Sequence, residues 1–339
     1  MKGDRKAGVL RNPYFCGFLV VLAAVPLVVG PQSYLVHILI LCSIYAILAA
    51  SWDLVSGYTG QISFAHAGLF AVGAYSAALS GAHLGVPPWA GIIVAGLIAA
   101  SFGLLIGVPA LRLKGHYLAI TTLAFSEIFR TVMLNAVSFS GGPFGIFDYP
   151  NFKRIAGSPA ESRLVTYYVI VVLMAASVLV MRWVGNHSAT GMILQAVRDD
   201  EIKAESLGYD VKWFKVGAFT LSAFFAGVAG ALYAYYVGVV SPVVSEVYVT
   251  ALVVTMAIVG GIGSIWGGVI GGFFVYALYE SLRFVNPVYN LICVGLILML
   301  VVVFFPRGLY GGLVWSIRQA RLASHRQSLS KAQAARTTE

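Results

Sequence analysis

Apolar residues gather in ten stretches along the chain, and polar segments separate them. Most of the stretches are long enough to cross the hydrocarbon core of a bilayer, about 30 Å thick, as a helix that rises about 1.5 Å per residue. The predicted spans cover residues 15–29, 34–55, 57–79, 89–111, 116–134, 166–183, 213–239, 247–259, 267–282 and 288–305. The pattern predicts an all-α, polytopic membrane protein with about ten transmembrane helices, in which one short span has the length of a broken or re-entrant segment.

The composition agrees with a membrane protein. Of the 339 residues, 59% are hydrophobic and 10% are charged, whereas soluble domains carry about 25% charged residues. The net charge of +9 does not indicate nucleic acid, because the basic residues lie at the chain ends and in loops rather than on one face. The three cysteines lie inside apolar stretches without metal-ligand spacing, so we expect small buried side chains there.

An even number of spans places both termini on one side of the membrane. The basic N-terminus, Arg112 with Lys114, the charged stretch after the sixth span and the basic tail then share that side, which is the pattern of cytoplasmic segments. We therefore expect a cytoplasmic N-terminus at 1–14, a transmembrane domain at 15–306 with a cytoplasmic loop at 184–212, and a cytoplasmic, disordered tail at 307–339.

The most polar stretch of the chain runs from residue 191 to residue 215. Nine of the chain's charged residues (22 basic and 13 acidic) lie between Arg198 and Lys215, and such a run cannot lie in hydrocarbon. Helix-favouring residues precede Gly208, which stands where a helix would stop. The stretch predicts a short helix in water that docks a cytoplasmic partner, and a solvated loop helix without a partner is the alternative.

The segment 57–66 is the most polar part of the predicted spans. Its glycines permit a broken helix, whose free backbone groups can face a substrate. The candidate residues of a translocation path are Gly57, Gln61, Ser63 and His66, with Thr121 and Thr122 in the fifth span. The same small residues also allow helices to pack closely, so both interpretations stay open.

Glycines also recur at every fourth position at Gly263, Gly267 and Gly271, which a helix would place on one face. This row predicts close helix packing, within the chain or between subunits, ahead of a role in translocation. A weak internal echo, typical of transporters built from two related halves, relates glycines 203 positions apart: Gly57, Gly60 and Gly68 recur as Gly260, Gly263 and Gly271.

Charged residues inside the spans come mostly in pairs. Glu127 with Arg130, and Glu280 with Arg283, are three positions apart, so each pair can meet on one helix face. An unpaired charge at mid-membrane costs roughly 2.5–3.5 kcal/mol on insertion scales. Pairing near a span end is therefore the simplest explanation, with a binding or relay role as the alternative. Asp53 lies near the end of the second span, where we expect it to reach water.

The chain lacks the common motifs for nucleotide binding and hydrolysis. It contains no GxxxxGK[ST], no HExxH and no GxSxG, and its six histidines are scattered. An enzyme in the membrane would need a paired nucleophile and base or metal ligands at fixed spacing. We therefore expect no catalytic site, no metal and no cofactor in this chain, and any ATP used in transport binds to another polypeptide.

Six stretches, taken together, resemble a known family. They are SWDLVSGYTGQISFAHAGLFAVGAYSAAL, LRLKGHYLAITTLAFSEIFR, SGGPFGI, AVRDDEIKAESLGYDVKWFKVGAFTLSAFFAGVAGALYA, VGGIGSIWGGVIGG and FFPRGLYG. In content and order, from about residue 49 to residue 311, they are similar to the branched-chain amino-acid ABC transporter permeases of the LivM type. The resemblance implies the fold of a type II ABC importer permease in the inner membrane of a bacterium.

For the charged stretch, the resemblance implies a coupling helix that lies in a groove of an ATPase. The role maps onto Arg198 to Gly208, with Ala204, Glu205 and Gly208 at the positions carried over from the family. The predicted coupling residues are Arg198, Asp199, Asp200, Glu201, Ala204, Glu205 and Gly208. Ser206 stands where relatives often have alanine, which is a small change. Mixed charges suit a specific, hydrated interface.

The resemblance also implies partners and a cargo. The partners are membrane lipid, a LivH-type permease subunit, two cytoplasmic ABC ATPase subunits that bind ATP with magnesium, and a periplasmic substrate-binding protein. The cargo is a branched-chain or related amino acid, with urea, short amides or aromatic acids as alternatives within the family. Two alternatives of other classes stay open: an ion-coupled secondary transporter, in which Glu127 or Asp53 would carry the coupling, and a structural membrane subunit without a path.

Overall fold

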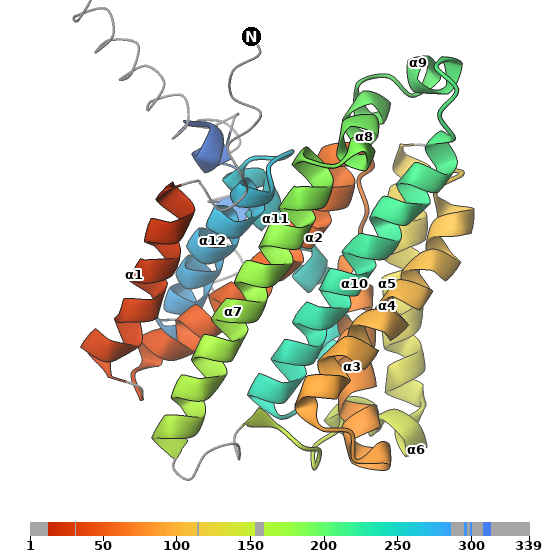
Figure 1. Cartoon of the computed structure of the whole chain (residues 1–339). Coiled ribbons are helices and arrows are strands. Elements are labelled where there is room, and N and C mark those ends of the chain that lie inside the picture. The colour runs from red at the N-terminus through yellow and green to blue at the C-terminus, as the bar shows by residue number, and fades with distance from the viewer. Residues whose placement is uncertain are drawn as a thin grey trace, which may run out of the picture.

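The computed structural model describes residues 13–30, 32–113, 115–152 and 159–285, together with residues 295–296, 299 and 308–312. Within these residues the chain is a bundle of helices that run roughly side by side (Figure 1). Two short helices, α8 and α9, lie at one end of the bundle, and α6 lies at the opposite end. Most of the predicted tenth span and of the tail, together with Lys114, Cys293 and residues 1–12, lies outside the described residues.

Nine helices of the described part correspond to the first nine predicted spans. They are α1 (Pro13–Val29), α2 (Tyr34–Thr59), α3 (His66–Leu84), α4 (Pro88–Ala110), α5 (His116–Asn135), α7 (Pro159–Asn186), α10 (Val211–Val237), α11 (Val247–Gly260) and α12 (Ile265–Val285). Seven of them are long and apolar enough to cross a membrane, while α1 and α11 are shorter apolar helices. The prediction of an all-α membrane protein is confirmed.

Two predicted boundaries were wrong. The third span was predicted to begin at Gly57, but α2 continues through Thr59, and α3 begins only at His66. Gly60 ends α2 because it adopts a left-handed conformation, with φ of 74°, that glycine reaches without strain. The sixth span was predicted from Thr166, but α7 begins at Pro159, a residue type that suits a first helical turn.

The described part of the connection between α5 and α7, residues 136–152, has short helices of its own. It contains α6 (Val137–Ser140) and the 3₁₀ helix η2 (Gly142–Phe144). Ile146 then pairs with Val240 in an antiparallel bridge, with N···O distances of 2.8 and 3.0 Å. The bridge joins this connection to the segment that follows α10.

Helix α2 forms the centre of the bundle. Nearly all of its residues from Ile38 onward are buried, and it packs against α7, α10 and α12. Small residues let other helices approach closely: Gly73 of α3 lies against the backbone of Gly227 in α10, where an added Cβ would collide. As predicted, Cys42 is buried inside its span.

Candidate functional site

The charged stretch forms two short helices, α8 (Ala189–Asp199) and α9 (Glu201–Ser206), rather than the single helix predicted up to Gly208. The break lies at Asp200, whose backbone is extended (φ −162°, ψ 107°). The Asp200 carboxylate accepts a hydrogen bond from the Lys203 backbone N–H at 3.1 Å and lies 3.0 Å from the Lys203 ammonium. Asp200 therefore caps the N-terminus of α9. These hydrogen bonds to Lys203 hold the pKa of the Asp200 carboxyl below its usual value.

A small apolar cluster holds α9 against the rest of the protein. Val197 of α8, Ala204 of α9 and Val211 of α10 are buried together. Next to them, the Lys215 ammonium of α10 lies 2.7 Å from the Glu201 carboxylate, and the Lys215 side chain is only 5% exposed. Ala204 and Glu201 thus fix the position of α9 on α10.

The Arg198 side chain connects α8 to the end of α2. Its guanidinium donates a hydrogen bond to the Gly57 carbonyl oxygen at 2.5 Å, and its methylene stem lies over Gly60. Gly57 is one of the last four residues of α2, whose carbonyl groups have no partner within a helix. A cation at this position also interacts favourably with the helix dipole. Arg198 therefore caps the C-terminus of α2 from another helix.

Asp53 connects the same end of α2 to the loop between α11 and α12. Its carboxylate accepts a hydrogen bond from the Gly263 backbone N–H at 2.7 Å. Asp53 is fully buried, so the expectation that it reaches water was wrong. The backbone N–H groups before a helix offer it a partner inside the protein instead. Gly57 makes the contact possible, because an added Cβ there would collide with the Asp53 carboxylate.

Helix α8 also contacts the end of α7. The Gln195 amide donates to the Gly185 carbonyl oxygen at 3.1 Å. The Tyr58 hydroxyl of α2 donates to the Asn186 side chain at 2.9 Å, so the ends of α2 and α7 are joined as well. Through these contacts the α8–α9 pair is attached to α2, α7, α10 and the loop before α12.

The outer surface of the α8–α9 pair exposes charged and apolar side chains together. Asp199, Glu205 and Gly208 are exposed, and Gly208 has φ of +87°. Ile202 and Leu207 are 71% and 75% exposed, although they are large apolar residues outside the predicted spans. Ile202 and Leu207 were not among the predicted site residues. Two large apolar residues inside a charged stretch were the sequence pattern that could have indicated a contact surface here.

The predicted path residues lie within or close to the segment 60–65, which links α2 to α3 without helical structure. The Phe64 backbone N–H donates to the Thr122 hydroxyl at 2.9 Å. The Phe64 carbonyl oxygen accepts from the hydroxyls of Ser126 at 3.1 Å and Thr250 at 3.3 Å. Side chains of α5 and α11 thus satisfy backbone groups that cannot stay unpaired within a membrane.

The other predicted path residues differ in their exposure. Ser63 and His66 are fully buried. The His66 Nε2 atom lies 2.8 Å from the Ser222 oxygen, and the Ser222 hydroxyl donates to the Ser51 carbonyl oxygen. Since the hydroxyl proton is used in that way, Nε2 carries the proton in the His66–Ser222 contact. Gln61 is half-buried and Thr121 is exposed.

The predicted glycine row, Gly263, Gly267 and Gly271, lies where α11 and α12 meet. Gly267 and Gly271 of α12 face the backbone of α11 near Gly260, where added Cβ atoms would collide. Gly263 differs from this pair, because it precedes α12 in a left-handed conformation with φ of +86°. The two stretches that echo each other in the sequence are also neighbours in space, since Gly263 lies against Gly57.

The predicted i,i+3 ion pairs are both formed. The Arg130 and Glu127 side chains are 3.6 Å apart, and the Arg283 and Glu280 side chains are 3.7 Å apart. In the part of the chain that the structure describes, no group of three or more His, Cys, Asp or Glu residues is placed to hold a metal ion.

Seven helices long and apolar enough to cross a membrane, with a non-helical connection at residues 60–65 and a charged helix pair at one end of the bundle, are the architecture of a polytopic membrane protein. Residues 34–302 match the family model described as branched-chain amino acid transport system / permease component. The chain belongs to this family, as the sequence motifs predicted.

Curated relatives agree with the family model. The chain is 33% identical over 323 residues to the high-affinity branched-chain amino acid transport system permease protein LivM of Escherichia coli K12, covering 89% of this chain and 75% of the relative. It is 32% identical to LivM of Salmonella typhimurium with the same coverage. It is also 27% identical to LivH of that organism, covering 79% of this chain and 92% of the relative. No solved structure matches this chain.

Proposed function

We propose that this chain is the LivM-type membrane subunit of an ATP-driven importer that carries branched-chain or related amino acids across the bacterial inner membrane. Family membership and the LivM relatives support this cargo class. The second set of relatives, named LivH, supports a related permease as the partner subunit. A periplasmic binding protein delivers the amino acid, and two cytoplasmic ATPase subunits bind ATP with magnesium, so this chain needs no cofactor of its own.

The α8–α9 pair is the ATPase-docking element in this proposal, and its side of the membrane is the cytoplasm, together with both termini. The observation that carries the proposal is the contact of Arg198 with the Gly57 carbonyl at the end of α2. A partner that moves α8 and α9 pulls directly on the centre of the bundle. Asp199, Asp200 and Glu205 supply charge to the hydrated interface, while Gly208 ends the element.

Exposed apolar side chains extend the same surface. Ile202 and Leu207 offer the ATPase an apolar contact that water otherwise surrounds. Ala204 lies on the inner side of α9, where it is buried against α8 and α10 and holds α9 in place. In this arrangement the predicted coupling residues divide into an outer group that contacts the ATPase and an inner group, Arg198, Glu201 and Ala204, that transmits the movement.

The test is co-purification of the complex together with uptake in proteoliposomes. Leu207→Asp and Ile202→Asp place a charge at the apolar contact and are expected to reduce the recovered ATPase at least tenfold. Leu84→Asp is the matched control, because Leu84 is a leucine of similar exposure, 77%, at the end of α3. Equal recovery of ATPase with all three variants contradicts the docking role. Uptake by this chain alone, driven by a proton gradient without any ATPase, contradicts the importer assignment.

A further inference from the structure

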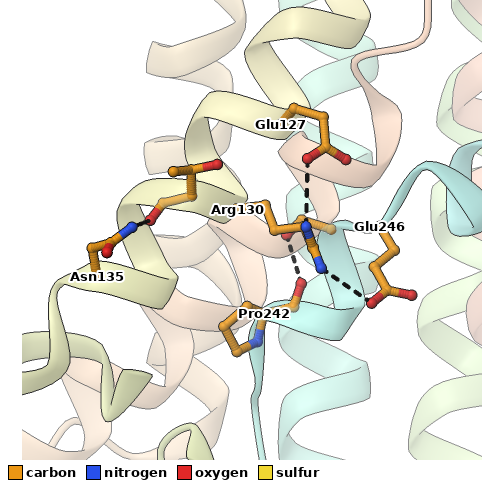
Figure 2. A network of polar contacts seen from close by, with 7 residues as sticks. Glu127, Arg130, Asn135, Pro242 and Glu246 are labelled. Carbon is orange, nitrogen blue, oxygen red and sulfur yellow. Dashed lines mark hydrogen bonds and ion pairs between the residues drawn. The ribbon is translucent and has the colours of Figure 1, made fainter. Parts of the chain in front are cut away.

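Three charged side chains meet beside α5, where α11 begins. The Arg130 guanidinium lies 3.6 Å from the Glu127 carboxylate and 3.5 Å from the Glu246 carboxylate, so it stands between two acids (Figure 2). Each of the three side chains is between 32% and 39% exposed. The cluster carries two negative charges and one positive charge, and part of it is open to whatever covers this face of the protein.

The cluster lies within the depth of the membrane. Helix α5 has 20 residues, about 30 Å at 1.5 Å per residue, and Glu127 lies about 12 Å before its C-terminal end. Helix α11 has 14 residues, about 21 Å, which is too short to cross the hydrocarbon core. Glu246 immediately precedes α11 and follows the 3₁₀ helix η4 (Pro242–Ser245). A helix that begins inside the membrane exposes polar backbone there, which lipid does not tolerate.

The face around the cluster is uncovered in the chain by itself. Of the 18-residue apolar stretch in each helix, only 22% is buried in α5, compared with 83% in α2. Ile128 of α5 and Val247 of α11 are 63% and 43% exposed. Charged side chains within membrane-spanning segments, even when they are paired, almost always face the bundle interior or a water-filled cavity rather than lipid. Water or a second protein therefore covers this face, rather than lipid chains.

The cluster lies close in the sequence to two residues that bind the non-helical segment 60–65. Ser126, which binds the Phe64 carbonyl oxygen, directly precedes Glu127 on α5. Thr250, which binds the same oxygen, lies one turn after Glu246 on α11. Irregular backbone at membrane depth lines a cavity or is buried in protein, and in transporters the ends of broken helices mark binding sites. The charged cluster thus stands at the edge of the segment 60–65.

We propose that Glu127, Arg130 and Glu246 contact the charged backbone groups of the amino-acid substrate as it moves along this face between the two permease subunits. The carboxylates pair with the substrate ammonium group, and the guanidinium pairs with its carboxylate, as charge-assisted hydrogen bonds require. The internal ion pairs keep each charge satisfied when no substrate is present. This inference rests on the proposed function and adds the place and the chemical basis of substrate contact.

The first measurement is uptake of L-leucine by the complete reconstituted complex. Glu127→Gln and Glu246→Gln are expected to lower the initial rate at least tenfold, with unchanged co-purification of the second permease and the ATPases. Arg283→Gln is the matched control, because it removes the charge of the other i,i+3 pair on α12, and it is expected to keep the rate within twofold. Normal uptake in the glutamine variants overturns the proposal. Loss of co-purification also overturns it, since the cluster would then be a contact between subunits.

The second measurement is labelling by a small, charged, water-soluble thiol reagent in a cysteine-free background. Glu127→Cys and Glu246→Cys are expected to react in the assembled complex, because water reaches the cluster. Ile93→Cys, which replaces an apolar residue of α4 that is 59% exposed, is expected to stay unreactive. No reaction at either cluster position overturns the proposal. Labelling does not require amino-acid transport, so a complex that takes up no leucine contradicts the proposed function and still reports on water access to the cluster.

Discussion

The Arg198 guanidinium and the Gly57 carbonyl oxygen are 2.5 Å apart, although the two residues are 141 positions apart in the sequence. This hydrogen bond joins α8 to the last turn of α2, whose apolar stretch is 83% buried. The Gly57 carbonyl, which would otherwise lack a partner, accepts a hydrogen bond from a positively charged group. The contact is therefore both a helix cap and a mechanical connection, and its removal is the most direct test of how α8 acts.

Arg198→Gln is expected to lower the amount of leucine taken up per ATP hydrolysed by about tenfold. The physical reason is the loss of a hydrogen bond to a charged group, worth about 1.5–3 kcal/mol. Lys203→Gln removes a basic residue that is 83% exposed on the neighbouring α9 and is expected to change this ratio less than twofold. Parallel measurement of ATP hydrolysis and uptake in proteoliposomes gives the ratio, and equal ratios for both variants would refute the connection.

Gly57→Ala is expected to destabilise the protein by about 1–3 kcal/mol, the usual effect of overpacking. The new Cβ would collide with the Asp53 carboxylate and lie 2.7 Å from the Gly263 nitrogen. Gly217→Ala on α10 is the matched control, because no described atom lies within 4 Å of its added Cβ. A glycine inside a helix favours unfolding, so the control is expected to be neutral or stabilising by about 0.5–1 kcal/mol. Thermal unfolding in detergent measures both, and a Gly57→Ala protein as stable as the wild type would disprove the close contact.

Protonation of Asp200 is expected to remove the cap of α9. The pKa of this carboxyl in the folded protein lies below the ordinary value of 3.8 because Lys203 binds the carboxylate. A lowered pKa stabilises the folded form fully above the ordinary value, and this stabilisation is lost as the pH falls through the folded pKa. Asp200→Asn keeps an oxygen that can cap and does not titrate. Hydrogen exchange at the Lys203 amide is expected to lose protection below about pH 3.8 in the wild type relative to Asp200→Asn, and parallel curves would count against the cap.

Glu201→Gln is expected to destabilise the protein more than Lys215→Met does. The first change leaves a buried ammonium without its partner, whereas the second replaces it with a side chain that suits the apolar surroundings. We expect Glu201→Gln to cost about 1–3 kcal/mol, less than the 3–5 kcal/mol of a fully buried pair, because Glu201 is 30% exposed. Denaturant unfolding of the two variants measures the order, and the reverse order would mean that Lys215 is not held by Glu201.

The apolar pattern predicted the helices well, because a helix that crosses a membrane must be predominantly apolar over about 20 residues. The boundary at Gly57 could not be found that way, since Tyr58 and Thr59 extend α2 and only the left-handed Gly60 ends it. The break at Asp200 was also missed. The surrounding residues favour helix, and the competing cap on Lys203 depends on a single side chain. The available signal for the break was Asp200 itself, because aspartate is one of the residue types that favour the N-cap of a helix.

The candidate site was predictable in outline and not in detail. The charge density around residues 198–215 is enough to place the stretch outside the membrane. The partners of its side chains are set by residues far along the chain: Arg198 binds Gly57, and Asp53 turns inward to Gly263 instead of reaching water. Only the folded bundle brings these groups together. The i,i+3 pairs succeeded for the opposite reason, because their geometry lies within one helix.

The three hydrogen bonds at Phe64 determine which parts of the chain can slide past one another. One residue of the α2–α3 connection binds Thr122 and Ser126 of α5 and Thr250 of α11. A shift of α5 along the segment 60–65 by one residue, about 1.5 Å, would break the bonds to Thr122 and Ser126 and leave backbone groups of Phe64 without these partners. The three bonds therefore hold the segment 60–65, the middle of α5 and the first turn of α11 together. A movement of one of these three parts relative to the rest of the bundle therefore has to carry the other two with it or break the bonds that they share.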